Sequence, residues 1–226
     1  MAQAQARKTN WFAIWVSIAV VVALVLVGAL VVWMNNTANA PGPRPESAGI
    51  NSETGAIVVG EGSNEVDIWF DFYCPHCQDF EDVYGPTVDE LLEAGDATVN
   101  LFPVALGPLN AASGTDFSER SANALYCIAE TTPEAAYPFM QSIFSYKPSG
   151  AGLTDEELIA EAEAAGAGDI STCVADREYV DFVGEQTQAL PVNPETGSAG
   201  TPALVVNGEY IAVTGDPQAD IVANLN

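Results

Sequence analysis

The sequence predicts an α/β protein in which a block of helices is inserted into a small sheet, preceded by a single transmembrane helix. Three observations support this fold class. An uninterrupted apolar run, Trp11–Met34, lies near the start of the chain. Strand-like alternation of apolar residues follows and changes, from Phe117, to about seventy residues of helical spacing. Strand patterns then return around Asn207–Gly208, a dipeptide typical of tight hairpin turns.

The apolar run Trp11–Met34 is long enough to cross a membrane as one helix. It contains no charged residue, and a helix of that length measures roughly 36 Å against a hydrocarbon core of about 30 Å. A cleavable signal peptide is the alternative, because Ala38–Ala40 resembles a cleavage site. The run is longer than a signal peptide needs, and Pro41 directly follows the candidate cut. We therefore expect a retained anchor.

Positive charges predict the orientation of this anchor. Arg7 and Lys8 precede it, whereas the first charge after it is Arg44. The positive-inside bias places residues 1–10 in the cytoplasm and everything after the anchor on the extracytoplasmic side of the cell membrane. Disulfide bonds persist in such compartments, so an oxidised cysteine pair is chemically reasonable here.

The chain is strongly acidic, with 31 Asp and Glu against 6 Lys and Arg and a formal net charge of −25. Such a field repels polyanions, so it excludes nucleic acid and anionic membrane surfaces as partners. The simplest interpretation of the remaining charge is a solvated, soluble surface. The only membrane contact we expect is through the anchor.

Residues 35–51, rich in Asn, Pro and Gly, are expected to form a flexible linker to one domain at 52–226. Apolar residues alternate along the second expected strand, Pro75 suits the first turn of a helix, and Thr154 with Glu157 forms a capping box. The expected elements are, in order, a strand at Ala56–Val59, a strand at Glu65–Cys74, a helix from Pro75 to about Glu93, a strand at Thr98–Val104, a helical insertion at about 116–190, a hairpin around Asn207–Gly208 and a short helix at Asp216–Leu225.

Two cysteines, Cys74 and Cys77, stand at the junction of the second strand and the following helix. A cysteine at a helix N-terminus faces unpaired N–H groups and the positive end of the dipole, which favour the thiolate. We expect Cys74 to be the sulfur that attacks or is attacked, and Cys77 to be the resolving partner. Pro75 stiffens the turn, and His76 is expected to stabilise the Cys74 thiolate, which makes the disulfide a stronger oxidant.

A zinc site and an inert cross-link are the alternatives for this pair. A closed zinc site needs two further ligands. His76 is the single histidine and lies inside the motif, while Cys127 and Cys173 lack the C-x-x-C spacing. An inert cross-link across so small a ring would constrain little chain. We expect a catalytic disulfide and no metal.

The segment WFDFYCPHC behind a strand, the helical stretch beginning SERSANALYCIAE and the GTP before the closing hairpin resemble the DsbA-like thiol–disulfide oxidoreductases. The likeness is strongest to the membrane-tethered members of Gram-positive and actinobacterial envelopes, and it covers roughly Asn51 to Asn226. It implies a thioredoxin-like core with an inserted α-helical domain. It also implies that Thr201–Pro202 forms a cis-proline loop that binds substrate peptide beside the cysteines.

The chain departs from this family at one position. Relatives often carry a buried carboxylate six residues before the outer cysteine, proposed as a proton shuttle, where this chain has Ile68. Strand alternation places Asp67 and Asp71 on the opposite face. This placement argues against a shuttle role for either of them.

Cys127 and Cys173 fall in the expected helical insertion. If Cys74 and Cys77 close on each other, these two are left as a natural second bridge, one of three pairings that four cysteines allow. A bridge over this separation stabilises the fold by about 4 kcal/mol through loop-closure entropy. Two buried free thiols and a second redox relay are the alternatives.

Together these features predict an exported, membrane-anchored enzyme that introduces disulfides into secreted or envelope proteins, with no cofactor beyond the Cys74–Cys77 disulfide. By family analogy, a DsbB-like or VKOR-like membrane protein reoxidises it, and tethering raises the effective concentration of the two partners. A reductase or isomerase of the same fold is the alternative among enzymes. A tethered peptide-binding or chaperone module, with a structural disulfide and a groove near Pro202, is the alternative outside them.

Overall fold

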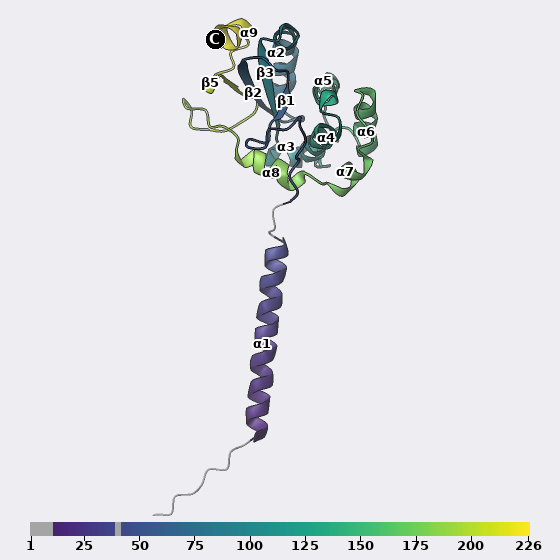
Figure 1. Ribbon diagram of the computed structural model, residues 1–226, viewed down its shortest axis with the longest axis vertical. Coiled ribbons are helices and arrows are strands. Elements are labelled where there is room, and N and C mark those ends of the chain that lie inside the picture. The colour runs from purple at the N-terminus through teal and green to yellow at the C-terminus, as the bar shows by residue number, and fades with distance from the viewer. Residues whose placement is uncertain (1–10, 39–41) are drawn as a thin grey trace, which may run out of the picture. The chain divides into compact units, whose positions relative to one another are not determined.

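The structure, a computed structural model, describes residues 11–38 and 42–226 (Figure 1). The chain divides into two compact units, Met1–Pro41 and Gly42–Asn226, which we describe separately. The segment predicted to be cytoplasmic, 1–10, lies outside the described residues. The same holds for most of the candidate signal-peptide cleavage site.

The first unit contains one long helix, α1 (Trp11–Ala38). Within the described residues, its stretch Ile14–Val32 is the one helix segment that is long and apolar enough to cross a membrane, and none of it is buried. The helix continues past Met34, the end of the apolar run. Its length and composition make it a candidate membrane span.

The second unit is built on a five-stranded sheet with the strand order β1–β3–β2–β4–β5 (Figure 1). Strand β2 is parallel to β3 and antiparallel to β4. Its apolar residues alternate as predicted, and Val66, Ile68 and Phe70 are all buried. The strands are β1 (Ile57–Val59), β2 (Asn64–Phe70), β3 (Ala97–Pro103), β4 (Ala203–Val206) and β5 (Glu209–Ile211).

Helix α2 (Pro75–Ala94) makes the crossover between the parallel strands β2 and β3. A proline at its first position suits a helix start, where the missing N–H would be unpaired in any case. Gly95 ends the helix in the left-handed conformation, with φ at 70°. The buried face of the helix consists of Cys77, Gln78, Phe80, Tyr84, Gly85, Val88 and Leu91.

Six α-helices lie between β3 and β4 within the described domain (Figure 1). Helix α4 is buried on nearly every side, and the ring of Phe72, just before α2, packs against Phe139 and Phe144 of α5. The sheet and the insertion therefore share one core. The helices are α3 (Gly107–Ser113), α4 (Phe117–Thr131), α5 (Ala136–Ser145), α6 (Asp155–Ala164), α7 (Ser171–Asp176) and α8 (Val180–Gln188). A short helix, α9 (Pro217–Asp220), follows the closing hairpin.

The described part of the expected linker, from residue 42 onward, packs against the domain. Arg44 forms an ion pair with Glu185 of α8, and the Ser47 hydroxyl donates to the Ala129 carbonyl of α4 (2.6 Å). Ile50 is buried in the core. The linker predicted at 35–51 is therefore ordered over its second half. Composition alone could not distinguish an irregular packed segment from a free one.

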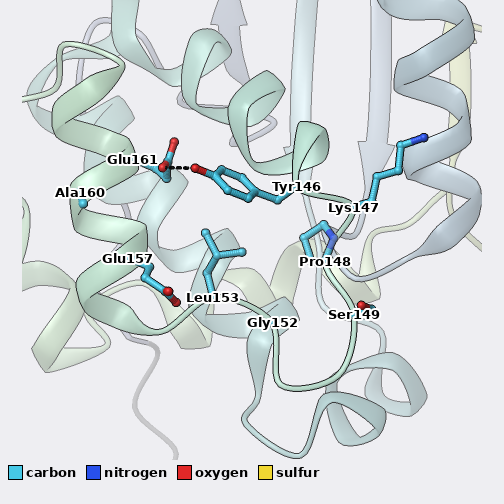
Figure 2. A pocket seen from close by; sticks show the side chains of 9 residues that line it. All are labelled: Tyr146, Lys147, Pro148, Ser149, Gly152, Leu153, Glu157, Ala160 and Glu161. Carbon is cyan, nitrogen blue, oxygen red and sulfur yellow. Dashed lines mark hydrogen bonds between the residues drawn. The ribbon is translucent and has the colours of Figure 1, made fainter.

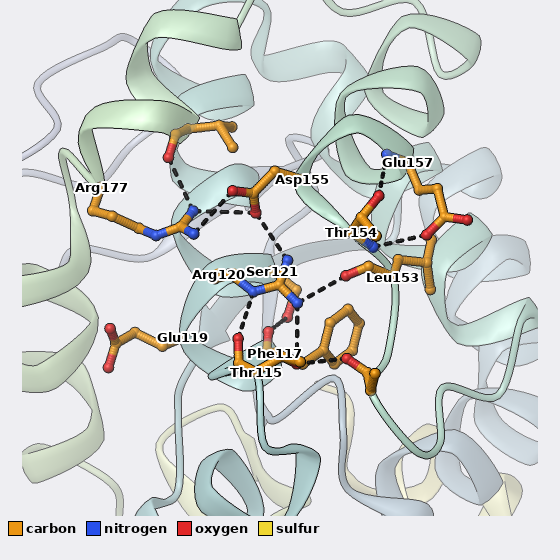
Figure 3. A network of polar contacts seen from close by, with 12 residues as sticks. Thr115, Phe117, Glu119, Arg120, Ser121, Leu153, Thr154, Asp155, Glu157 and Arg177 are labelled. Carbon is orange, nitrogen blue, oxygen red and sulfur yellow. Dashed lines mark hydrogen bonds and ion pairs between the residues drawn. The ribbon is translucent and has the colours of Figure 1, made fainter.

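A polar network fixes the start of α6 to α4 and α7 (Figure 3). The Asp155 carboxylate accepts from the buried guanidinium of Arg120 (2.8 Å) and from Arg177 (2.9 Å). The predicted capping box is present, because the Glu157 N–H donates to the Thr154 hydroxyl and the Glu157 carboxylate accepts the Thr154 N–H. These contacts fix the first turn of α6 beside α4 and α7, while Leu158 and Ala162 of the same helix are buried in the core.

Candidate active site

The active-site turn begins where β2 ends. The strand stops at Phe70 rather than at Cys74, because Asp71 starts a tight turn. The Cys74 N–H donates to the Asp71 carbonyl (3.0 Å), and the Tyr73 N–H donates to the Asp71 carboxylate (2.8 Å). Cys74 is the N-cap of α2 in extended conformation, with Pro75 next. The first amides of the helix therefore surround the Cys74 sulfur.

Both cysteines of the motif are buried thiols in the structure. Cys74 is 4% exposed and Cys77 is 1% exposed. The outer position is thus only slightly more accessible than the inner one, because the Thr201–Pro202 loop lies against it. When it is protonated, the Cys74 thiol donates to the Thr201 carbonyl at 3.5 Å. A partner sulfur must approach along this loop.

The two sulfurs differ in acidity. The pKa of Cys74 is lowered to about 5, chiefly by the hydrogen bond from Cys77, with help from Thr201 and from the amides of Cys77 and His76; burial opposes this. Burial, followed by the hydrogen bond and negative charge of Cys74, raises the pKa of Cys77 well above its ordinary value. At neutral pH one sulfur is a thiolate and the other a thiol. This is the division of roles that thiol–disulfide exchange requires.

Pro75 and His76 are both exposed at the start of α2. The sequence predicts that His76 stabilises the Cys74 thiolate, and in the structure the backbone N–H of His76 contributes to this. Its side chain lines the groove beside the motif. Among the carboxylates that follow the motif, Asp82 forms an ion pair with Lys147, which offsets part of the local negative charge.

The Thr201–Pro202 peptide bond is cis. The Thr201 hydroxyl is buried without a hydrogen-bond partner among the described residues, and it lies close enough to both sulfurs to lower their pKa. A groove of about 450 Å³ adjoins this loop and α2. Its apolar lining includes Phe80, Val83, Pro202 and Val213. The arrangement can hold an extended peptide beside Cys74.

The loop between α5 and α6 is fastened to the same turn. The Tyr73 hydroxyl donates to the Gly150 carbonyl (2.8 Å), and the Gln78 side chain donates to the Pro148 carbonyl (3.1 Å). A second pocket of about 360 Å³ lies between this loop and α6, where the Tyr146 hydroxyl donates to Glu161 (Figure 2). None of the site residues predicted from the sequence lines this pocket, although Glu157 of the predicted capping box does.

The predicted outward placement of Asp71 is wrong. Because β2 ends at Phe70, strand alternation no longer applies to Asp71, and its carboxylate is buried beside the turn instead of facing away. Asp67 does lie within the strand, where it accepts from the Asn100 side chain (2.7 Å). The D-x-x-C spacing of an Asx turn was the signal that could have found Asp71.

Cys127 and Cys173 form a disulfide in the structure, with a Cα–Cα distance of 5.9 Å. The bond joins α4 to α7, two helices of the insertion. Across residues 11–38 and 42–226, no group of three or more His, Cys, Asp or Glu side chains is placed to hold a metal ion. The described residues thus contain one bridge and one thiol pair.

The fold and the pair at the start of α2 define a thioredoxin-like thiol–disulfide oxidoreductase. A family model described as Thioredoxin matches residues 52–220, and the chain belongs to that family. The predicted likeness to DsbA-like proteins and the predicted thioredoxin-like fold with a helical insertion are thereby confirmed. No curated protein sequence matches the chain.

Solved structures of related proteins support the same class. The chain is similar to reduced DsbA from Mycobacterium tuberculosis, with 28% identity, a TM-score of 0.61 and coverage of 80% of this chain and 88% of that one. It is also similar to the reduced disulfide bond oxidoreductase DsbG of the same organism, with 28% identity and a TM-score of 0.61. That match covers 81% of this chain and 86% of the DsbG chain. MdbA, a thiol-disulfide oxidoreductase from Actinomyces oris, matches with 22% identity and a TM-score of 0.61, and the match covers 76% of this chain and 83% of the MdbA chain. At this identity the match shows the fold alone.

Proposed function

We propose that this protein is an exported, membrane-anchored dithiol oxidase that introduces disulfides into secreted or envelope proteins through Cys74 and Cys77. The observation that carries the proposal is the asymmetry of the two sulfurs. A Cys74 thiol with a pKa of about 5 is a good leaving group, and stabilising its thiolate stabilises the reduced form of the pair. A pair whose reduced form is favoured oxidises other thiols.

In the first step, a client thiolate attacks the Cys74 sulfur of the Cys74–Cys77 disulfide. The bond between the two enzyme sulfurs breaks, a mixed disulfide forms, and Cys77 leaves with the electron pair. Because the pKa of Cys77 is high, it takes up a proton and becomes a thiol. The groove beside Thr201–Pro202 would hold the client chain during this exchange.

In the second step, another client thiolate attacks the client sulfur of the mixed disulfide. A disulfide forms in the client, and Cys74 leaves as a thiolate. Two electrons have then passed from the client to the enzyme pair, which is left reduced. No cofactor beyond this pair is needed for the exchange itself.

Turnover needs a partner that removes these two electrons. We propose a quinone-linked membrane protein of the DsbB-like or VKOR-like class, consistent with the apolar helix α1 near the start of the chain. With residues 1–10 in the cytoplasm, the thiol pair would stand on the extracytoplasmic side. Tethering both proteins in one membrane raises their effective concentration.

The proposal is tested by equilibrating the purified protein with glutathione redox buffers and measuring the fraction reduced. A reduction potential near the oxidising end of the family range, roughly −120 mV, supports the oxidase. A value near that of thioredoxin, about −270 mV, contradicts it. The Cys74→Ser variant is the control that assigns the measured signal to this pair.

A reductase or isomerase is the second candidate, because the chain is as similar to the DsbG structure as to the DsbA structure. It would be kept reduced by a different partner and would resolve wrong disulfides. A peptide-binding module is supported by the groove alone. Client binding that survives loss of both Cys74 and Cys77 would favour that module over either enzyme.

A further inference from the structure

One buried carboxylate beside the thiol pair has no part in the exchange steps above. Asp71 is 0% exposed, and its two oxygens face two different segments. One accepts the Tyr73 N–H in the active-site turn and the other accepts the Leu106 N–H just before α3, both at 2.8 Å. The buried Ser118 hydroxyl of α4 lies near the same carboxylate. Asp71 therefore joins the turn that presents Cys74 to the helical insertion.

Amide donors rather than a cation hold this carboxylate. The ion pairs within the described domain lie elsewhere and are Arg44–Glu185, Arg120–Asp155, Arg177–Asp155 and Lys147–Asp82. A buried charge without a counter-ion is unfavourable. Burial raises the pKa of Asp71 to about 6, which leaves it largely ionised at neutral pH. A carboxylate suits this position because both of its oxygens accept hydrogen bonds, one from the Tyr73 N–H and one from the Leu106 N–H.

An amide side chain could not make the same two contacts. Asn has one acceptor oxygen and an NH₂ donor, so either the Tyr73 or the Leu106 N–H would meet a donor. A buried N–H left without an acceptor destabilises the arrangement that contains it. The effect reaches Cys74 directly, because the Cys74 N–H donates to the backbone carbonyl of Asp71.

We propose that Asp71 is a positioning residue for the thiol chemistry, whose carboxylate clamps the active-site turn to the start of α3 and holds the Cys74 sulfur against its hydrogen-bond donors. The inference rests on the proposed function in one respect, since it takes Cys74 as the reactive sulfur. Hydrogen bonds from Cys77 and the first amides of α2, together with the nearby Thr201 hydroxyl, stabilise the Cys74 thiolate. Such bonds weaken steeply when their geometry is lost.

The negative charge of Asp71 acts in the opposite direction, because a like charge disfavours the Cys74 thiolate. This repulsion is the weakest of the influences on the Asp71 pKa, behind burial and its hydrogen bonds. The main influences on the Cys74 pKa are its hydrogen bonds and its burial. We therefore expect loss of the clamp to outweigh loss of the charge. Removing either the carboxylate or its Leu106 donor should make the Cys74 thiol less acidic.

The test is the pH profile of iodoacetamide alkylation of the reduced protein, which reports the thiolate fraction of Cys74. In Asp71→Asn we expect the midpoint to rise by about one pH unit, so alkylation below both midpoints slows about tenfold. Asp67→Asn is the matched control, because this half-buried carboxylate of β2 contacts Asn100 instead of the turn. Its profile should stay where the wild-type profile lies.

Leu106→Pro provides a second variant that keeps the charge. It deletes the N–H donor, and the backbone of Leu106, with φ −71° and ψ 122°, already suits proline. We expect a smaller upward shift of the midpoint. Urea unfolding confirms that each profile comes from folded protein, and Leu106→Pro decides alone if Asp71→Asn does not fold.

An unmoved or lowered midpoint in either folded variant overturns the positioning role. The outcome is independent of the direction of electron flow, which the wild-type glutathione equilibrium decides. A reducing wild-type potential combined with raised midpoints would overturn the oxidase and keep the role of Asp71. An oxidising potential with unmoved midpoints would do the reverse.

Discussion

The two cysteine pairs show how the backbone around a sulfur decides its chemistry. Cys127 and Cys173 form a bridge across 46 residues, while Cys74 and Cys77 lie within one helical turn and are thiols. Exposure does not explain the difference, because Cys127 is as deeply buried as the motif cysteines and its partner Cys173 is more exposed than they are. The difference lies in the donors. Cys74 is the N-cap of α2, where the first amides of the helix are unpaired, whereas Cys127 lies in the middle of α4, where the amides are already bonded. Its partner Cys173 is the third residue of the short helix α7.

This contrast predicts that reactivity and stability belong to different pairs in this domain. A sulfur among free donors can both attack and leave, because its thiolate is stabilised. A sulfur inside a packed helix has no such support and serves as a fixed link. Substitutions in the first pair should therefore change activity, and substitutions in the second should change stability.

The largest expected effect is the loss of activity in Cys74→Ser. A serine oxygen cannot form the mixed disulfide, so oxidation of a reduced client protein should fall to the uncatalysed rate. The measurement is the appearance of client disulfides by mass spectrometry after quenching. Residual catalysis in Cys74→Ser would mean that the Cys127–Cys173 bridge takes part in the chemistry.

Removal of the bridge is expected to change stability instead. The Cys127→Ala/Cys173→Ala variant should lose about 4 kcal/mol of unfolding free energy, since its unfolded chain is no longer closed over 46 residues. Urea unfolding of the two proteins measures this loss. The glutathione equilibrium of the Cys74–Cys77 pair should remain at the wild-type value. A displaced equilibrium would contradict the separation of the two pairs.

The pH dependence of stability gives a third comparison. The native pKa of Cys74, about 5, lies below its unfolded value near 9.0. It therefore stabilises the reduced protein fully above the unfolded value, and this contribution disappears as the pH falls through 5. Cys77, whose pKa is raised, acts in the opposite sense only above about pH 9.

Between pH 5 and 8, the stability of the reduced protein should therefore rise relative to the disulfide form, by at most about 1.4 kcal/mol per pH unit. Urea midpoints of both forms, measured at each pH, give this difference. Groups that titrate in both forms largely cancel. A difference that stays flat with pH would show that Cys74 is not the acidic thiol.

Much of this fold could be predicted because its signals are local. Alternation along Val66, Ile68 and Phe70 identified the central strand, and the Asn207–Gly208 turn identified the closing hairpin. The C-x-x-C spacing after a strand placed Cys74 and Cys77 at a helix start, where the structure has them. Periodicity and turn chemistry depend on neighbours in the chain, so they can be read without the fold.

What could not be predicted depends on contacts between distant segments. Asp71 looked like an outward-facing strand residue, but its carboxylate is buried because Leu106, 35 residues later, supplies a donor. Residues 42–51 looked like a tether, but Ser47 and Ile50 find partners and space on the insertion and the core. These contacts cannot be predicted from the local sequence pattern, because they join segments that are far apart in the chain and meet only in the folded protein.

The smallest expected effect concerns the cap of α6, which supports the insertion far along the chain from the thiol motif. Thr154→Ala removes the hydroxyl that accepts the Glu157 N–H (3.2 Å), so one helix-start amide loses its side-chain partner. We expect the free energy of unfolding, measured in urea, to fall by about 1 kcal/mol, with client oxidation unchanged.

Thr154→Ser keeps the acceptor and should recover most of the lost free energy of unfolding. Equal losses in the two variants would show that the methyl group, rather than the cap, stabilises this turn. A change in the glutathione equilibrium would show that the insertion communicates with Cys74 beyond the clamp at Asp71.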